Sequence, residues 1–254
     1  MAEDQLAVQI SPSMPGMSGF FISDAAIERF FLWEPEMALK FPDGSVVGFA
    51  STLSAAIPFT AITNTNPAKI THSGAVVDGD ILAIQSSWSG LNNRASVAGG
   101  GEGNGTELLG IDTTDTDLFR PGGGAGSILI ASGFVDFSQQ GELTSSGGEP
   151  QTYTGKWLED PLGQEFQVPI GQTARQYALT LDYDATLPWF DAAKAITRKR
   201  KPTVIRIQLP DGDIVYEYGY VHFNPGLNMN SGNPIKNAVN FYLLGSEGTL
   251  IEKV

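Results

Sequence analysis

The sequence predicts a mainly β fold: a sandwich or barrel-like core with one flanking α-helix and a small inserted β module. Three observations carry this prediction. Residues 176–254 alternate between apolar and polar with the period of two that marks a half-buried strand. Short apolar runs bounded by Gly, Pro and Asn recur between residues 58 and 126. Inside this β-rich region, residues 186–201 carry an apolar stripe of helical spacing.

The first 39 residues are predicted to be an N-terminal arm with one short helix. Residues 1–19 are rich in Ser, Pro, Met and Gly without a sustained period, which is typical of a leader that has no core of its own. Ser23 or Asp24 can cap the helix that follows. Its Phe30 and Phe31 lie on one side, and we expect that side to cover its own core, with an intersubunit contact as the alternative.

Residues 40–57 and 127–254 are predicted to form the main β domain, and residues 58–126 the inserted module. The module shows short strands broken by two glycine clusters, at 99–105 and 122–126, which favour flexible joints. A long apolar strand is expected at residues 128–137. A mobile loop is expected at residues 145–150. The expected strands of the module are AITN (61–64), AKITH (68–72), GDILAIQ (79–85) and ELLGID (107–112).

The C-terminal third is predicted to be an antiparallel hairpin followed by a third strand. Residues 204–209 alternate, so one face is expected to be buried and the other to meet solvent. A Pro-Asp-Gly-Asp turn at 210–213 leads into a second strand over 214–223, with three tyrosines on one side. The third strand covers 239–243, and a long, mobile connection is expected over 224–237.

One helix is expected before this hairpin and should pack on the sheet. Its stripe contains Trp189, Ala193 and Ile196, and Thr186 is placed to cap its N-terminus. The helix ends in the only basic run of the chain, Arg198, Lys199, Arg200 and Lys201, and Pro202 follows it. Cations at a helix C-terminus complement its partial negative charge. A contact with phosphates, or with an acidic patch on a neighbouring copy, stays open as an alternative.

Composition narrows the class of function. The 254 residues include 15 Lys and Arg against 28 Asp and Glu, a formal net charge of −13, which argues against coating nucleic acid because phosphate binding needs basic surface. There is no cysteine, so disulfides and thiolate metal sites are excluded. The acidic N-terminus and the lack of a long apolar run predict a soluble protein without membrane insertion that is not secreted through a signal peptide.

No motif in the chain predicts catalysis or a cofactor. The glycine clusters lack GxGxxG spacing and are not followed by Lys-Ser or Lys-Thr, so they are interpreted as loops. Asp112, Asp115 and Asp117 miss the spacing of a calcium loop and are interpreted as solvated acids. His72 and His222 are the only histidines, too few for a multi-imidazole metal site. No cofactor and no metal are expected.

The order of these segments resembles the major tail tube proteins of long-tailed bacteriophages. Members of that family typically end in a strand, a helix, a strand with the pattern R-I-x-[FL]-P-[DN]-G, a strand with an aromatic-Gly-aromatic centre and a last strand near a glycine. The inserted module is also similar to β modules that some members carry. The resemblance covers residues 40–245. Its matching residues are Arg206, Ile207, Leu209 to Gly212, Tyr218 to Val221 and Val239 to Gly245 in the core, and Ile62, Thr63, Pro67 to Thr71, Gly79 to Ile81 and Leu91 to Arg94 in the module.

The resemblance implies a structural virion protein that polymerises as stacked hexameric rings to form the tail tube, the conduit for DNA ejection, after assembly in the host cytoplasm. Its implied partners are further copies of itself, the tail terminator, tape measure and tail tip proteins, and phage DNA in transit without specific binding. An acidic wall would let DNA pass where a basic wall would hold it. Asp182, Asp184 and Glu217 are therefore our candidate lumen acids, and Arg198 to Lys201 the candidate intersubunit cations.

Two rival readings stay open on the sequence. A β-sandwich that binds carbohydrate or a receptor at a phage tail would use exposed aromatic faces such as Trp88, Trp157, Trp189 and the row from Tyr216 to Tyr220. A hydrolase would need paired carboxylates, and Glu159 with Asp160 is the adjacent pair. Adjacent residues on a strand point to opposite faces, so this pair is a poor candidate and we expect no enzyme.

Overall fold

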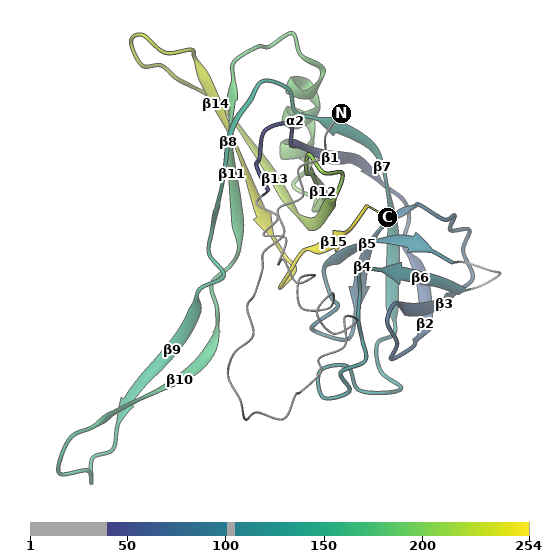
Figure 1. Ribbon diagram of the computed structural model, residues 1–254, viewed down its shortest axis with the longest axis vertical. Coiled ribbons are helices and arrows are strands. Elements are labelled where there is room, and N and C mark those ends of the chain that lie inside the picture. The colour runs from purple at the N-terminus through teal and green to yellow at the C-terminus, as the bar shows by residue number, and fades with distance from the viewer. Residues whose placement is uncertain (1–39, 101–104, 254) are drawn as a thin grey trace, which may run out of the picture. The chain divides into compact units, whose positions relative to one another are not determined.

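The structure is a computed structural model that describes residues 40–100 and 105–253 (Figure 1). The chain divides into two units, Met1–Lys40 and Phe41–Val254. The predicted arm and its helix after Ser23 and Asp24 lie outside the described residues. The regular structure of the described chain is strand apart from α2 (Pro188–Lys199), which is the one α-helix within it.

Seven strands form a long antiparallel sheet in the order β7-β1-β12-β13-β14-β11-β8. A three-residue strand, β15, pairs with the start of β13. The bounds are β1 (Val46–Leu53), β7 (Gly126–Asp136), β8 (Gln140–Ser146), β11 (Gln176–Asp182), β12 (Thr203–Gln208), β13 (Ile214–Asn228), β14 (Lys236–Leu243) and β15 (Thr249–Ile251).

Helix α2 packs on one face of this long sheet. Its buried residues include Trp189, Ala193 and Ile196, which confirms the stripe read from the sequence. Together with one face of the strands they form the largest apolar core, in which Trp189 packs against Phe137 and Phe223 with ring centroids 5.6 and 5.8 Å apart. The helix therefore closes the sandwich on that side.

The start of α2 differs from the prediction. The N-cap is Leu187 and makes no side-chain capping bond. Thr186, the predicted cap, instead donates its hydroxyl proton to the Asp184 carboxylate at 2.6 Å, in a turn before the helix. Pro188 occupies the first helical position, where its fixed φ suits the helix and its missing N–H removes a donor that would have needed a cap.

The hairpin of β12 and β13 is confirmed, with Val204 opposite Tyr218 and Arg206 opposite Tyr216. Its turn is closed by the Leu209 amide, which donates to the Asp213 carbonyl at 2.8 Å. Gly212 has φ +98°, a conformation that side-chain-bearing residues rarely adopt, so the glycine is required by the turn.

The second face of this hairpin is covered over part of its length, where the prediction had it meet solvent. Val204 is fully buried, and Tyr216 and Tyr218 are 5% and 2% exposed. They pack against Ala83 and Ala95 of the module in a separate apolar cluster. The sequence alternation correctly separated the two faces, but it carried no sign that a second layer would cover the more polar one.

The inserted module is a closed six-stranded antiparallel barrel in the order β2-β3-β6-β5-β4-β7, and β2 pairs back with β7 to close it. Strand β7 is long enough to belong to both barrel and long sheet (Figure 1). The barrel has its own core, which includes Ile84, Trp88 and Leu108. Strand β5 was absent from the predicted set. The bounds are β2 (Ile57–Ile62), β3 (Ala68–His72), β4 (Ile81–Ser86), β5 (Arg94–Gly99) and β6 (Gly105–Leu109).

One expected mobile connection is a hairpin, and the other is a short loop that leads into one. Residues 224–237 largely continue β13 to Asn228 and begin β14 at Lys236. Residues 145–150 join β8 to a separate two-stranded sheet of β9 (Pro150–Lys156) and β10 (Glu165–Gln172), which projects from one end of the long sheet (Figure 1). These segments carry few apolar residues in strict alternation, so the alternation of apolar and polar residues could not predict their strands.

The fold class is confirmed: mainly β, with a sandwich-like layer, a closed barrel, one packed helix and an extra two-stranded sheet. The proposed division at residues 58 and 126 stays a prediction, because β7 serves both sheet and barrel. Within the described residues, no helix is long and apolar enough to cross a membrane.

Candidate assembly surfaces

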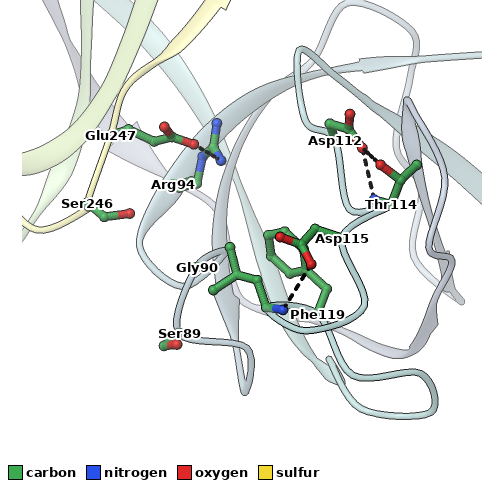
Figure 2. A pocket seen from close by; sticks show the side chains of 10 residues that line it. Ser89, Gly90, Arg94, Asp112, Thr114, Asp115, Phe119, Ser246 and Glu247 are labelled. Carbon is green, nitrogen blue, oxygen red and sulfur yellow. Dashed lines mark hydrogen bonds and ion pairs between the residues drawn. The ribbon is translucent and has the colours of Figure 1, made fainter.

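One cavity of about 600 Å³ lies between the barrel and the loop before β15 (Figure 2). Its charged groups are occupied within its own wall. Glu247 pairs with Arg94 at 2.5 Å, and Asp112 accepts the amide and hydroxyl protons of Thr114, which lower the pKa of its carboxyl. Asp115 accepts two backbone amides of its own loop. The cavity thus shows loop-stabilising acids without free catalytic or ligating groups.

The described residues contain no group of three or more His, Cys, Asp or Glu side chains placed to hold a metal ion. His72 is buried on β3, and its Nε2 lies 2.7 Å from the Thr106 hydroxyl. His222 is exposed on β13. The two histidines therefore have separate environments.

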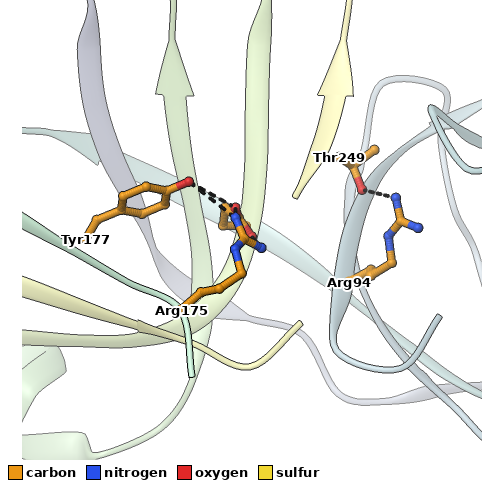
Figure 3. Close-up of polar contacts among 5 residues, drawn as sticks. Arg94, Arg175, Tyr177 and Thr249 are labelled. Atoms are coloured by element: carbon orange, nitrogen blue, oxygen red, sulfur yellow. Dashed lines mark hydrogen bonds and ion pairs between the residues drawn. The ribbon is translucent and has the colours of Figure 1, made fainter. Parts of the chain in front are cut away.

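Glu217, a predicted lumen acid, is buried instead. It is 1% exposed and pairs with Arg175 at 2.5 Å, while the Tyr177 hydroxyl lies 3.4 Å from the same carboxylate oxygen (Figure 3). Burial raises the pKa of Glu217, against the opposing pull of Arg175. The prediction that this carboxylate faces a lumen is inconsistent with its burial, because its strand position turns it toward the helix-covered face, opposite Ile205.

Buried and half-buried charged side chains around Glu217 connect three parts of the fold. Arg94, on β5 of the barrel, is 6% exposed, and its pKa is lowered by burial. Its guanidinium contacts Thr249 of β15 at 3.5 Å (Figure 3). Arg175 lies at the base of the β9–β10 hairpin, between β10 and β11. Arg94, Glu217 and Arg175 thus fix the barrel and the hairpin base against the long sheet.

Four strands at the end of the long sheet present one exposed face. On β11 the exposed or half-buried side is Gln176, Ala178, Thr180 and Asp182, opposite the buried Leu179 and Leu181. Lys236 of β14 lies opposite Asp182 in the register. The other side chains of this exposed face are Glu142, Thr144 and Ser146 of β8, Tyr220, His222 and Asn224 of β13, and Ala238, Asn240 and Tyr242 of β14.

The candidate lumen acids Asp182 and Asp184 lie at one end of this polar face. Asp182 ends β11 and is half-buried beside Lys236. Asp184 follows the strand and is bound by Thr186, whose hydrogen bonds lower the pKa of the Asp184 carboxyl.

Both ends of this four-strand segment have unpaired strand edges. β8 pairs only with β11, so its outer edge is open within the described chain. β12 covers β13 only up to Gly219. Beyond it, the Thr197 hydroxyl accepts the Phe223 amide at 2.9 Å and lies 3.4 Å from the Val221 carbonyl. The remaining edge, to Asn228, has no strand partner among the described residues.

The candidate intersubunit cations lie at the end of α2, next to that edge. Arg198, Lys199, Arg200 and Lys201 are all exposed. Arg200 is the C-cap, with φ +50° in the left-handed region. None of the four forms an ion pair within the described residues. They are available for a partner.

The β9–β10 hairpin has almost no core. All but two of its strand residues are exposed, and Trp157 stacks on Phe166 with centroids 5.1 Å apart while remaining 62% exposed. An isolated two-stranded hairpin is marginally stable in water. Its exposed large apolar side chains are Tyr153, Trp157, Leu158, Leu162, Val168 and Ile170.

The aromatic residues proposed for carbohydrate stacking are mostly inaccessible. Trp88 and Trp189 are 6% and 1% exposed, and Tyr216 and Tyr218 are buried under the barrel. Trp157 alone among the tryptophans of the described chain is exposed, and its ring is stacked on Phe166. Of the predicted row from Tyr216 to Tyr220, only Tyr220 is exposed, at 38%. Glu159 and Asp160 lie in the hairpin tip, where Asp160 accepts turn amides.

Comparisons with known proteins give one family match and a structural likeness. The family model of the phage tail tube protein matches residues 86–252. Among solved structures, the chain is similar to one from the tail of an empty GTA particle with C6 symmetry: TM-score 0.34 and 12% identity over 48% of this chain and 88% of that one. No curated protein matches the chain.

Proposed function

Because the chain belongs to the phage tail tube protein family, a structural component of the virion tail, we propose that six copies join edge to edge into a ring and that rings stack into the DNA conduit. The observation that carries this proposal is the pair of unpaired edges, on β8 and on β13 beyond Gly219, at the two ends of one polar-faced four-strand segment. An edge that is left open must be covered, or it aggregates.

Strand direction supports ring closure. The segment β8-β11-β14-β13 is antiparallel throughout and has an even number of strands, so its two edge strands run in opposite directions. When β13 of one copy meets β8 of the next, the new pair is therefore antiparallel as well. Every copy uses the same two edges, a head-to-tail contact that closes when the rotation closes.

The width of the bore expected from this geometry favours a ring of six copies over a ring of three. Six four-strand segments, at about 4.8 Å between strands and about 40° tilt, close a barrel about 48 Å across between backbones. Side chains reduce this by about 10 Å, which leaves room for a double helix. Three copies would leave about 14 Å, hardly wider than the DNA major groove alone at about 12 Å.

The polar face would line the bore. Core residues and α2 cover the other face, so the exposed side of β8, β11, β14 and β13 is the one left for the lumen. Asp182 and Asp184 add negative charge at one end of it, and the net charge of −13 keeps the wall from holding a duplex that carries one charge per about 1.7 Å. The DNA would pass without specific binding.

The β9–β10 hairpin would connect successive rings. It leaves the sheet at Ser146 and Gln176. The β13–β14 turn lies at the opposite end of the sheet, and there Asp182 lies across from Lys236. Its seven-residue strand β9 spans about 24 Å, as long as β11 itself. Burial against the next ring would cover its apolar side chains. The barrel joins the long sheet through β7 and covers Tyr216 and Tyr218, before the open edge of β13 begins. It would lie outside the ring of four-strand segments, and the terminator, tape measure and tip proteins would contact the ends of the tube. Assembly would take place in the host cytoplasm.

The test is negative-stain electron microscopy of the purified chain at rising concentration, paired with analytical ultracentrifugation. We expect rings with six-fold averages and then tubes of one bore. A chain that stays monomeric at every concentration, with and without purified tail tip complex as initiator, would overturn the proposal.

A further inference from the structure

We propose that Glu142 and Glu149 form an acidic edge that meets Arg198 and Arg200 of the neighbouring copy, so that ring closure is selected by charge as well as by strand pairing. The inference rests on the proposed edge-to-edge ring. It identifies which side chains of a second copy the free cations of α2 contact.

The basic side of the proposed contact, Arg198 and Arg200, lies at a cavity next to the β13 edge. Arg198 and Arg200 line a cavity of about 650 Å³ together with Tyr220, His222 and Tyr242 of the polar face. The cavity adjoins the β13 edge at Val221, where Thr197 covers part of the backbone. Arg200 closes the helix in the left-handed region, which fixes where the run leaves α2.

The acidic side lies along the opposite edge of the same segment. Glu142 is the one charged residue of β8, it is exposed, and its side chain shares the polar face with Thr144 and Ser146. Glu149 follows two glycines with positive φ and is exposed immediately before β9. Neither carboxylate forms an ion pair within the described residues. The two edges of the segment are thus oppositely charged.

The register brings these charges to the same level. Ser146, Gln176, Tyr242 and Tyr220 form one row across the four strands. If a neighbour docks without an axial offset, its Glu142 lies level with Asn224. The neighbour cannot slide toward Gly219, because β12 already pairs with β13 there.

Sliding in the permitted direction brings Glu149 toward Val221. Offsets from zero to four residues therefore keep one of the two carboxylates within three residues of Val221, about 10 Å along the strand. An arginine and a glutamate side chain together span that distance. Opposite potentials on two docking surfaces accelerate association and reject wrong registers, because like charges brought together cost several kcal/mol.

The experiment exchanges the charges. Variant A carries E142R and E149R, and variant B carries R198E and R200E. Each alone opposes like charges at every contact, and we expect its assembly concentration to rise at least about tenfold. In an equimolar mixture, A and B attract at both kinds of contact when they alternate. Alternation closes only rings with an even number of copies, so six-fold rings should return, as they should for a chain carrying all four substitutions.

The matched control is Lys69→Glu with Arg120→Glu, which makes the same charge change as variant B but on the barrel, and it should assemble as the wild type does. Thermal unfolding checks that each variant is folded. If wild-type rings form while variant B behaves like the control, or if the A and B mixture fails to assemble, this inference is wrong and the proposed ring stands. If the wild type itself makes no rings, the proposed function fails.

Should variant B not fold, E142Q with E149Q replaces it. Loss of the acidic charges should raise the wild-type assembly concentration and remove most of its dependence on salt, because the neutral edge has no attraction for salt to screen. An unchanged assembly concentration and salt dependence would contradict the charge pairing.

Discussion

The barrel and the four-strand end of the long sheet solve the same problem in opposite ways. In the barrel, β2 pairs back with β7, so every strand has two neighbours and no edge remains. In the segment β8-β11-β14-β13, the outer strands keep open edges. A closed sheet is complete as a monomer, whereas an open one is incomplete until a copy arrives. The proposed assembly therefore uses the sheet and not the module.

The largest effect is expected where the two regions are fixed to each other. Glu217→Ala removes a carboxylate that is 1% exposed and leaves Arg175, with Arg94 nearby, without its counter-charge. Breaking a buried ion pair in this way costs about 3–5 kcal/mol. Urea unfolding of the monomer should show that loss. Glu247→Ala removes an exposed partner of Arg94 and serves as the comparison, with a smaller cost expected. Equal stability of Glu217→Ala and wild type would show that the buried network is dispensable.

Deleting the β9–β10 hairpin should separate folding from stacking. Residues 150–172 are replaced by a short Gly-Ser link, and because their side chains bury little within the protomer, the free energy of unfolding should change by less than about 1 kcal/mol. Tubes should be lost while single rings persist, as seen by electron microscopy. Full-length tubes from the deleted chain would contradict a stacking role.

A narrower version replaces Trp157 and Leu158 by serine. Both are largely exposed, at 62% and 102% of their reference areas. Monomer stability should be unchanged, and tubes should shorten at a fixed protein concentration. The matched control is Val77→Ser, an equally exposed apolar residue before β4 of the barrel, for which tube length should stay that of the wild type.

A proline at an edge should act differently in the two regions. Backbone amides alternate in direction along a strand, so of Thr144→Pro and Ser145→Pro in β8, one removes an outward donor and leaves the β8–β11 ladder intact. That variant should keep the monomer's melting temperature and lose rings. Thr71→Pro in β3 lies between Ala61 and Gly105 of two partner strands and should destabilise the monomer. Ring formation by both β8 variants would exclude this edge from assembly.

The sequence was sufficient wherever structure is local. The β12–β13 hairpin follows from alternation plus a Pro-Asp-Gly turn, and α2 from its spacing of Trp189, Ala193 and Ile196. Barrel closure was not predictable, because it depends on β2 finding β7 some 70 residues along the chain. The β9–β10 hairpin was missed because its burial pattern is nearly uniform, which gives no period to read.

The candidate site divides along the same line. The period placed Glu217 on a strand, and the family resemblance led us to assign it to the lumen, but neither could foresee Arg175 arriving from 42 residues away to hold it inside. The basic run was identified because four consecutive cations are visible in any sequence. The acidic edge was missed because Glu142 is a lone acid in a polar strand. Only the register of the four strands shows which part of β13 lies level with Glu142.

The smallest effect is expected from the lumen acids. Asp182→Lys leaves the pairing of β11 with β14 intact, since only the side chain on the polar face changes. Rings and tubes should form with the same bore, but Asp182→Lys adds two units of positive charge per copy beside Lys236. Six copies per ring would then attract a passing duplex, whose binding grows with each neutralised phosphate. Phage carrying this variant should eject DNA more slowly in low salt, with the delay shrinking as salt rises. Asp182→Asn, which removes the charge without reversing it, should fall between the two, and ejection unaffected by either variant at any salt concentration would place Asp182 away from the DNA.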